Sequence, residues 1–150
     1  VRLLMQVVEA VKIVWPPDLP LFVRISATDW VEDGWNLQDS IQLASILKEK
    51  GVDLLDCSTG GNVPDAKIPA GPLYQATFAE QIKKETGMRT GAVGIITTAQ
   101  QAEDLIKNEA ADLILMGRQM LRDPYFALHA AKELDVDVPW PVQYERAKRH

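Results

Sequence analysis

The sequence is poor in the residues that build disulfides and metal sites: it has one cysteine, Cys57, and two histidines, His129 and His150. A single cysteine excludes a disulfide bond within the chain and is typical of proteins from a reducing compartment. Because the sequence contains no cluster of cysteines and histidines, we expect no zinc site and no other bound metal. These absences favour a cytoplasmic protein without a disulfide framework.

Long apolar stretches and an excess of positive charge are also missing. No run approaches the roughly 18 consecutive apolar residues of a membrane span, and no signal peptide is visible. The formal net charge of −5 argues against nucleic acid as the main partner. With 47% hydrophobic and 25% charged residues, the composition is that of a soluble globular protein.

What the sequence does contain is four short apolar runs, each followed by a stretch with helical character. They are residues 21–26 (LFVRIS), 53–58 (DLLDCS), 90–94 (TGAVG) and 112–117 (DLILMG). This alternation predicts a parallel α/β sheet with right-handed crossovers. A closed (β/α)8 TIM barrel needs eight such units and about 250 residues. We therefore expect half a barrel, as one unit over residues 1–150 with no internal boundary.

Capping residues mark the helix boundaries. Asn36 with Asp39, and Thr98 with Gln101, have the spacing of a capping box. The Asp-Pro pair at residues 123–124 predicts an N-cap followed by a proline in the first helical position. Helices are expected over residues 1–15, 36–50, 74–86, from 98 onward, and 123–134.

Two features suggest that the chain does not stand alone. The first expected helix has no residue before it that could act as a cap, so we expect a fragment of a longer protein. Four parallel strands also leave two open sheet edges, which proteins normally avoid. We therefore expect a homo-oligomer or association with a missing barrel half.

The proline-rich residues 62–73 form a long loop, and such loops are usually functional or mobile.

The last two apolar runs end in glycine-rich turns, at residues 91–94 (GAVG) and at Gly117-Arg118. Glycine lets backbone N–H groups approach a phosphate closely, and Arg118 could donate two hydrogen bonds to a dianion. TIM barrels often bind phosphate with the loops after strands 7 and 8, so these turns favour the C-terminal half of a barrel. The alternative is two ordinary turns with a solvated arginine, and spacing alone leaves both open.

Arg24 lies between apolar neighbours on a strand that we expect to be buried. A buried cation without a partner is costly, so Arg24 must face an opposite charge or an electron-rich group. One hypothesis is that it faces a bound anion or ring, since charges inside barrels cluster near active sites. The other is a structural salt bridge with a carboxylate such as Asp56.

Three further kinds of residue have two possible roles each. Cys57 is interpreted as a small buried hydrophobe rather than a nucleophile, because no histidine accompanies it in the pattern. Ser58 could line a pocket or simply form the turn after its strand. Trp30 and Trp35 follow another strand end, and either border a flat ligand or pack within their loop.

The motifs FVRISATDW, GVDLLDCSTGG, GAVGIIT, ADLILMGRQMLRDPYFA and PVQYERA occur in this order along the chain. Together they closely resemble the old yellow enzyme family, in particular its bacterial NADPH dehydrogenase or ene-reductase branch. The resemblance extends over essentially all 150 residues. It implies an FMN-binding (β/α)8 barrel that oxidises NADPH and reduces the activated C=C bonds of small-molecule enones.

The resemblance also implies roles for individual residues. Arg24 would contact the flavin near N1 and O2, where a positive charge stabilises the reduced cofactor. Gly94, Gly117 and Arg118 would bind the FMN phosphate, and Ser58 would lie in the same cofactor site. Arg146 would reach into the active site of a neighbouring subunit, although here the chain continues with AKRH.

The resemblance places the substrate-carbonyl donors and the tyrosine proton donor of the family in the other half of the barrel. None of those motifs can be mapped onto this sequence. We therefore expect the isolated chain to be inactive. The alternative hypothesis is a non-catalytic flavin- or phosphate-binding half-barrel that associates with itself.

Overall fold

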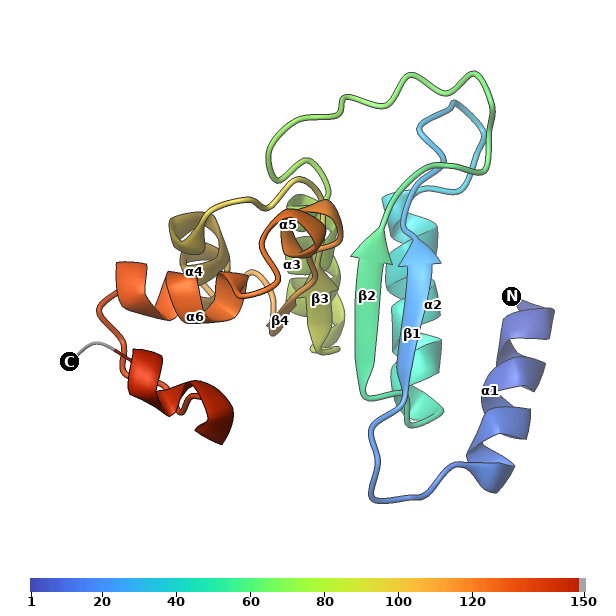
Figure 1. Ribbon diagram of the computed structural model, residues 1–150. Helices are drawn as coiled ribbons and strands as arrows, with labels where there is room; N and C mark the ends of the chain where they lie inside the picture. Colours follow the sequence, from blue (N-terminus) through green and yellow to red (C-terminus); the bar gives the residue numbers. More distant parts are fainter. Residues whose placement is uncertain (149–150) are drawn as a thin grey trace.

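The computed structural model describes residues 1–148, which contain a four-stranded parallel sheet (Figure 1). The strands lie side by side in chain order, and every adjacent pair is parallel. They are β1 (Phe22–Ser26), β2 (Leu54–Ser58), β3 (Thr90–Ala92) and β4 (Leu113–Ile114). The four predicted strands are confirmed, although each is shorter than its apolar run because part of the run belongs to a connection.

The helices alternate with these strands as the sequence predicts. Both capping boxes are present: the side chain of Asn36 accepts the Asp39 N–H at 3.2 Å, and Thr98 accepts the Gln101 N–H at 3.2 Å. Each box satisfies N–H groups that have no partner inside the first helical turn. The helices are α1 (Arg2–Val14), α2 (Leu37–Glu49), α3 (Ala76–Thr86), α4 (Ala99–Lys107), α5 (Arg118–Arg122), α6 (Phe126–Glu133) and the 3₁₀ helix η1 (Val142–Ala147).

The helix predicted over residues 123–134 is wrong at its start. α5 ends at Arg122 and α6 begins at Phe126, so the Asp-Pro pair lies in the connection between them. Asp123 closes α5 in a non-helical conformation, with φ −135° and ψ 88°. Its carboxylate accepts the N–H of Tyr125 at 3.2 Å, which fixes a turn instead of opening the helix directly.

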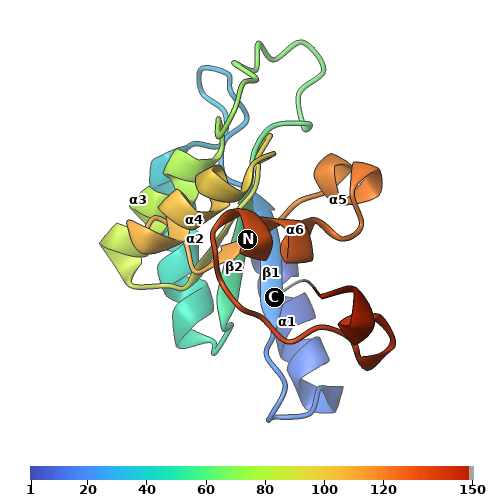
Figure 2. The ribbon, with the colours of Figure 1, turned by 60° about the vertical axis from the view of Figure 1, so that its left-hand side comes forward.

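One face of the sheet is covered by α2, α3 and α4, which lie together on the same side in Figure 2. α2 packs against α3, and α3 packs against β2 and β3. The core lies between this helical layer and the sheet, with Leu47, Leu55, Ile82 and Met88 almost fully removed from solvent. Helices thus cover one side of the parallel strands, as the expected half-barrel requires.

The opposite face of the sheet is open where β1 and β2 run (Figure 1). The side chain of Arg24 is 56% exposed, and Phe22 on the same strand is 49% exposed. The expected burial of Arg24 is therefore wrong for the described residues, because no second layer covers this face of β1. Val23, which points to the helical side, is buried as the strand alternation requires.

The loops that follow β1 and β2 lie together beyond the carboxyl ends of these strands (Figure 1). Gly60 donates its N–H to the carbonyl of Thr28 at 2.9 Å, and Asn62 donates to Asp29 at 2.8 Å. The predicted long loop is confirmed, since no helix or strand is assigned between β2 and α3. None of the described helices is long and apolar enough to cross a membrane.

Cys57 belongs to the core, as the sequence suggested, and is fully buried on β2. Burial, reinforced by the neighbouring charge of Asp56, raises the pKa of the Cys57 thiol to about 12. The thiol is therefore protonated at neutral pH and acts as a small hydrophobe, because the thiolate is the nucleophilic form.

We expect Cys57 to resist alkylation in the folded chain at about pH 8 and to react once the chain is unfolded. Its folded pKa lies above the ordinary value of 9.0, so its contribution to stability is complete below about pH 9. That contribution is lost as the pH rises toward about 12. Denaturant unfolding over this range should show a steeper loss of stability for the parent than for Cys57→Ala. Stoichiometric labelling of the folded chain would contradict this assignment.

Candidate functional site

The turns after β3 and β4 line a common cavity of about 130 Å³ at the carboxyl end of the sheet. Gly94 comes from the first turn and Arg118 from the second, as the sequence predicted for a phosphate site. Thr97 and Arg122 also line the cavity, and none of the described residues around it is acidic. The cavity therefore combines positive charge with exposed backbone.

The donors around this cavity are free to bind an anion. Among residues 1–148, no hydrogen bond or ion pair engages the Arg118 guanidinium. In the same part of the chain, the N–H groups of Gly94, Gly117 and Arg118 have no protein acceptor. No atom lies within 4 Å of the position that a Cβ on Gly117 would take, so the backbone there is open to a ligand. This donor set suits a phosphate dianion, which accepts several charge-assisted hydrogen bonds.

Gly94 is required by its surroundings as well as by its conformation. Its φ is 120°, and a Cβ at this position would lie 3.0–3.2 Å from side-chain atoms of Gln75. The sequence analysis missed Gln75, which is 3% exposed at the start of α3. The available signal was a glutamine between apolar residues directly before a helix, a position that buries a polar group only when it has partners.

Arg24 and Asp56 form an ion pair across β1 and β2, with 2.7 Å between Nη1 and Oδ2. The parallel register places the two residues side by side. Asp56 is 9% exposed at its side chain, and its second oxygen, Oδ1, is buried without a partner among the described residues. The salt-bridge hypothesis is therefore confirmed, while the exposed Arg24 guanidinium keeps donors for a further group on the open face.

Ser58 and the two loop tryptophans are engaged within the protein. The Ser58 hydroxyl donates to Gln75 Oε1 at 3.3 Å, so it helps to hold the turn after β2. Trp35 donates its indole N–H to Ser40 at 2.6 Å, and Trp30 packs edge-on against Phe78 with ring centroids 5.4 Å apart. These contacts favour loop packing over a ligand-bordering role for the tryptophans.

Arg146 lies in η1, away from the carboxyl ends of the strands (Figures 1 and 2). The described chain thus brings Gly94 and Arg118 to one cavity, and Gly117 directly precedes Arg118 in the second turn. It places Arg24 and Asp56 on the open sheet face, and it does not bring Arg146 to either group. Among residues 1–148, no group of three histidine, cysteine, aspartate or glutamate side chains is placed to hold a metal ion.

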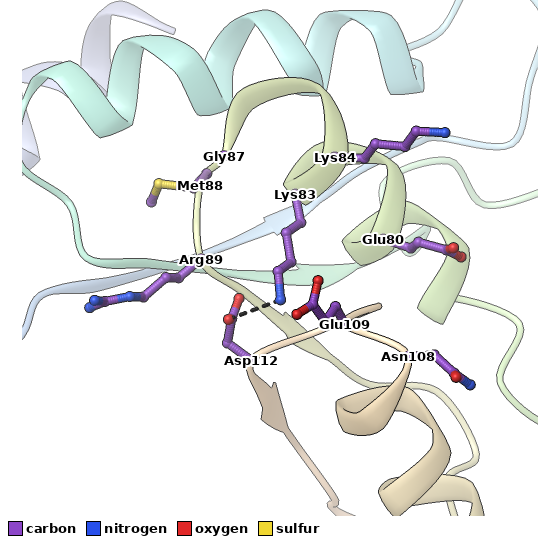
Figure 3. A pocket seen from close by; sticks show the side chains of 9 residues that line it. All are labelled: Glu80, Lys83, Lys84, Gly87, Met88, Arg89, Asn108, Glu109 and Asp112. Carbon is purple, nitrogen blue, oxygen red and sulfur yellow. Dashed lines mark hydrogen bonds and ion pairs between the residues drawn. The ribbon is translucent and has the colours of Figure 1, made fainter.

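A larger cavity, of about 430 Å³, opens at the other end of β3 and β4 (Figure 3). Its lining carries charges of both signs, and two of them are paired: Lys83 lies 3.0 Å from Asp112, which also accepts the Thr90 N–H at 2.9 Å. Figure 3 shows this pair at the centre of the group. This cavity lies at the amino ends of the strands, whereas barrel enzymes carry their chemistry at the carboxyl ends.

Comparison with a solved structure concerns the fold. A chain of the solved complex of 2-naphthoyl-CoA reductase with 2-naphthoyl-CoA superimposes with a TM-score of 0.78 at 22% sequence identity. The match covers 88% of this chain and 21% of that one. It shows that the four parallel strands and their helices have the arrangement of part of a TIM-barrel reductase.

Curated relatives share much more sequence. The chain is 51% identical over 146 residues to the NADPH dehydrogenase of Bacillus velezensis and 50% identical over 145 residues to that of Bacillus subtilis. Each match covers 97% of this chain and 42% of the relative, so the chain spans less than half the length of these proteins. The predicted pairing of FMN with NADPH as reductant is confirmed at the level of the family. Residues 1–137 match the family model itself, and the chain belongs to the NADH:flavin oxidoreductase / NADH oxidase family.

Proposed function

We propose that the chain is the C-terminal, phosphate-binding half of an FMN-dependent barrel that oxidises NADPH and reduces the activated C=C bond of enones. The cavity between the turns after β3 and β4 carries this proposal, because it collects unpaired donors and no acid from the described residues. The short helix α5 directly after β4 supports the C-terminal placement. In TIM barrels such an extra helix commonly joins the loops after strands 7 and 8 in binding phosphate.

In this proposal Arg118 and the N–H groups of Gly94 and Gly117 hold the phosphate of FMN. Arg24 would contact the flavin near N1 and O2 from the open face, with Asp56 orienting its guanidinium, and Ser58 would fix the neighbouring turn. FMN, when bound, supplies hydride transfer from NADPH to an electron-poor alkene. The residues of this chain bind and orient the cofactor and stabilise negative charge on it.

The rest of the proposal concerns partners. The open face of β1 and β2 would be closed by the other half of the barrel, and Arg146 would reach a neighbouring subunit. We place the protein in the cytoplasm and residues 1–150 in one structural unit. The second candidate is a non-catalytic flavin-binding half-barrel that closes this face with a second copy, which the exposed Phe22 and Leu113 favour.

Flavin absorbance of the purified protein, followed by an NADPH oxidation assay with an enone, tests these candidates. Bound flavin with enone-dependent NADPH oxidation supports the reductase. Bound flavin without turnover supports the non-catalytic half-barrel. Failure to bind flavin, both alone and with the complementary half supplied, would contradict both.

We expect Arg118→Ala to weaken FMN binding by about tenfold or more, because a charge-assisted contact to phosphate is lost. FMN titration followed by flavin fluorescence gives the dissociation constants. Arg89→Ala is the matched control, since Arg89 lines the cavity at the opposite end of the sheet. Equal FMN affinity of the Arg118 variant and the parent would remove Arg118 from the site.

We expect Arg24→Met to lower the reduction potential of the bound flavin, because the negative charge of the reduced cofactor loses its partner. The substitution also leaves Asp56 as an unpaired buried carboxylate, which acts in the same direction. The double variant Arg24→Met/Asp56→Asn removes that second effect and isolates the arginine. Redox titration measures all three proteins, with Lys83→Met as a control for loss of a cation at the far end. A potential that stays constant or rises would contradict the assignment.

We expect the isolated chain to associate and to show no turnover of enones. The open face exposes apolar groups such as Phe22 and Leu113, and burying a few hundred Å² of such surface contributes several kcal/mol at about 25 cal/mol per Å². Light scattering gives the mass of the purified chain directly. A stable monomer with a sharp cooperative melt would contradict the association, and turnover with FMN alone would show that no other half is needed.

A further inference from the structure

We infer that Gln75 is a positioning residue for the cofactor phosphate. It fixes the turn at Gly94 against the end of β2, and thereby sets how strongly the site prefers FMN over riboflavin. The inference rests on the proposed function for its ligand, but its structural part concerns this chain alone.

The first observation is the way in which Gln75 is held. The residue is 3% exposed, and its Oε1 accepts three hydrogen bonds at the end of β2. Thr59 donates its N–H at 2.6 Å and its hydroxyl at 2.7 Å, and the Ser58 hydroxyl donates at 3.3 Å. Three donors on one oxygen fix the orientation of the amide, because the Nε2 group cannot accept any of them.

The second observation is what lies on the other side of the amide. The Nε2 atom is 3.0 Å from the position that a Cβ on Gly94 would take, and the Cβ and Cγ atoms of Gln75 are 3.1 and 3.2 Å from it. Among residues 1–148, no hydrogen-bond acceptor is paired with this Nε2 group. The same segment donates the Leu73 N–H to the carbonyl of Gly94 at 2.9 Å. Gly94 is therefore held in place by Leu73 and Gln75, which lie directly before α3.

These contacts make one buried side chain the link between the ends of two neighbouring strands. Gly94 and Arg118 line the same cavity, so a shift of this turn would move backbone donors relative to a phosphate held there. Donor positions within a few tenths of an ångström decide the strength of charge-assisted hydrogen bonds. Riboflavin lacks the phosphate, so its binding does not depend on the turn in the same way.

Two variants separate positioning from a general effect on folding. Gln75→Glu keeps an acceptor for Thr59 and Ser58, but replaces the amide donor beside Gly94 with a carboxylate oxygen. Gln75→Leu removes the acceptor and frees the turn. Gln42→Glu, on the exposed surface of α2, is the control for one added negative charge.

We expect Gln75→Glu to lower FMN affinity by about tenfold or more, while riboflavin affinity changes by less than about threefold, since a new charge repels the phosphate and not the ring. The control should leave both dissociation constants within about twofold of the parent, because its charge lies on an exposed, screened surface. In the ligand-free protein, amide hydrogen exchange of residues 93–97 should be faster in Gln75→Leu, while α2 keeps its protection.

Equal losses of FMN and riboflavin affinity in Gln75→Glu, or unchanged FMN affinity, would overturn the inference. Unchanged exchange of residues 93–97 in a folded Gln75→Leu protein would overturn its structural part. A parent protein that binds FMN no more tightly than riboflavin would contradict the proposed function instead. In that case the exchange measurement, which needs no ligand, still decides whether Gln75 holds the turn.

Discussion

The parallel register of the four strands is the constraint on which the rest of the structure depends. It places Arg24 beside Asp56, Asp56 beside Gly91, and Gly91 beside Leu113. Parallel pairing also brings every carboxyl end to the same edge, so the turns after β3 and β4 become neighbours although more than twenty residues separate them. A slip of one residue would move each side chain to the opposite face, which would break the Arg24–Asp56 pair and bury its charges under the helices.

Gly91 shows how tightly this register is specified. A Cβ at Gly91 would collide with the side chain of Leu115 and lie 3.4 Å from Leu54. The Leu115 side chain can occupy this position because Gly91 has no side chain. Phe22 and Leu113 on the same face stay 49% and 42% exposed. The sheet is thus covered by helices on one face (Figure 2), while apolar side chains on its other face remain exposed to solvent.

Local sequence patterns predicted the parts of the fold that depend on neighbouring residues. The capping boxes at Asn36 and Thr98 and the four strands are of this kind, because their signals lie within a few positions of one another. The start of α6 was predicted wrongly, since Asp123 was already engaged in ending α5. The contacts of Gln75 could not be predicted from local sequence patterns, because its partners Thr59 and Gly94 lie 16 and 19 residues away in the chain.

The same limit applies to the candidate site. Glycine turns after two consecutive strands predicted that Gly94 and Arg118 would meet, and they line one cavity. Spacing could not show whether Arg118 would be neutralised by a carboxylate, and that question decides between a ligand site and an ordinary turn. The cavity at the opposite end of the sheet is larger, yet its central cation, Lys83, is already paired with Asp112.

Charge therefore distinguishes the two ends of the sheet better than volume does. The chain carries a net charge of −5, so acidic side chains outnumber basic ones. An arginine without a carboxylate partner is therefore unexpected. Arg118 and Arg122 flank a cavity that no acidic residue of the described chain lines. Two cations held close together repel each other, and an anion bound between them relieves that repulsion. Neither arginine has a carboxylate partner among the described residues, and this arrangement is the basis for proposing that the cavity binds the phosphate of FMN.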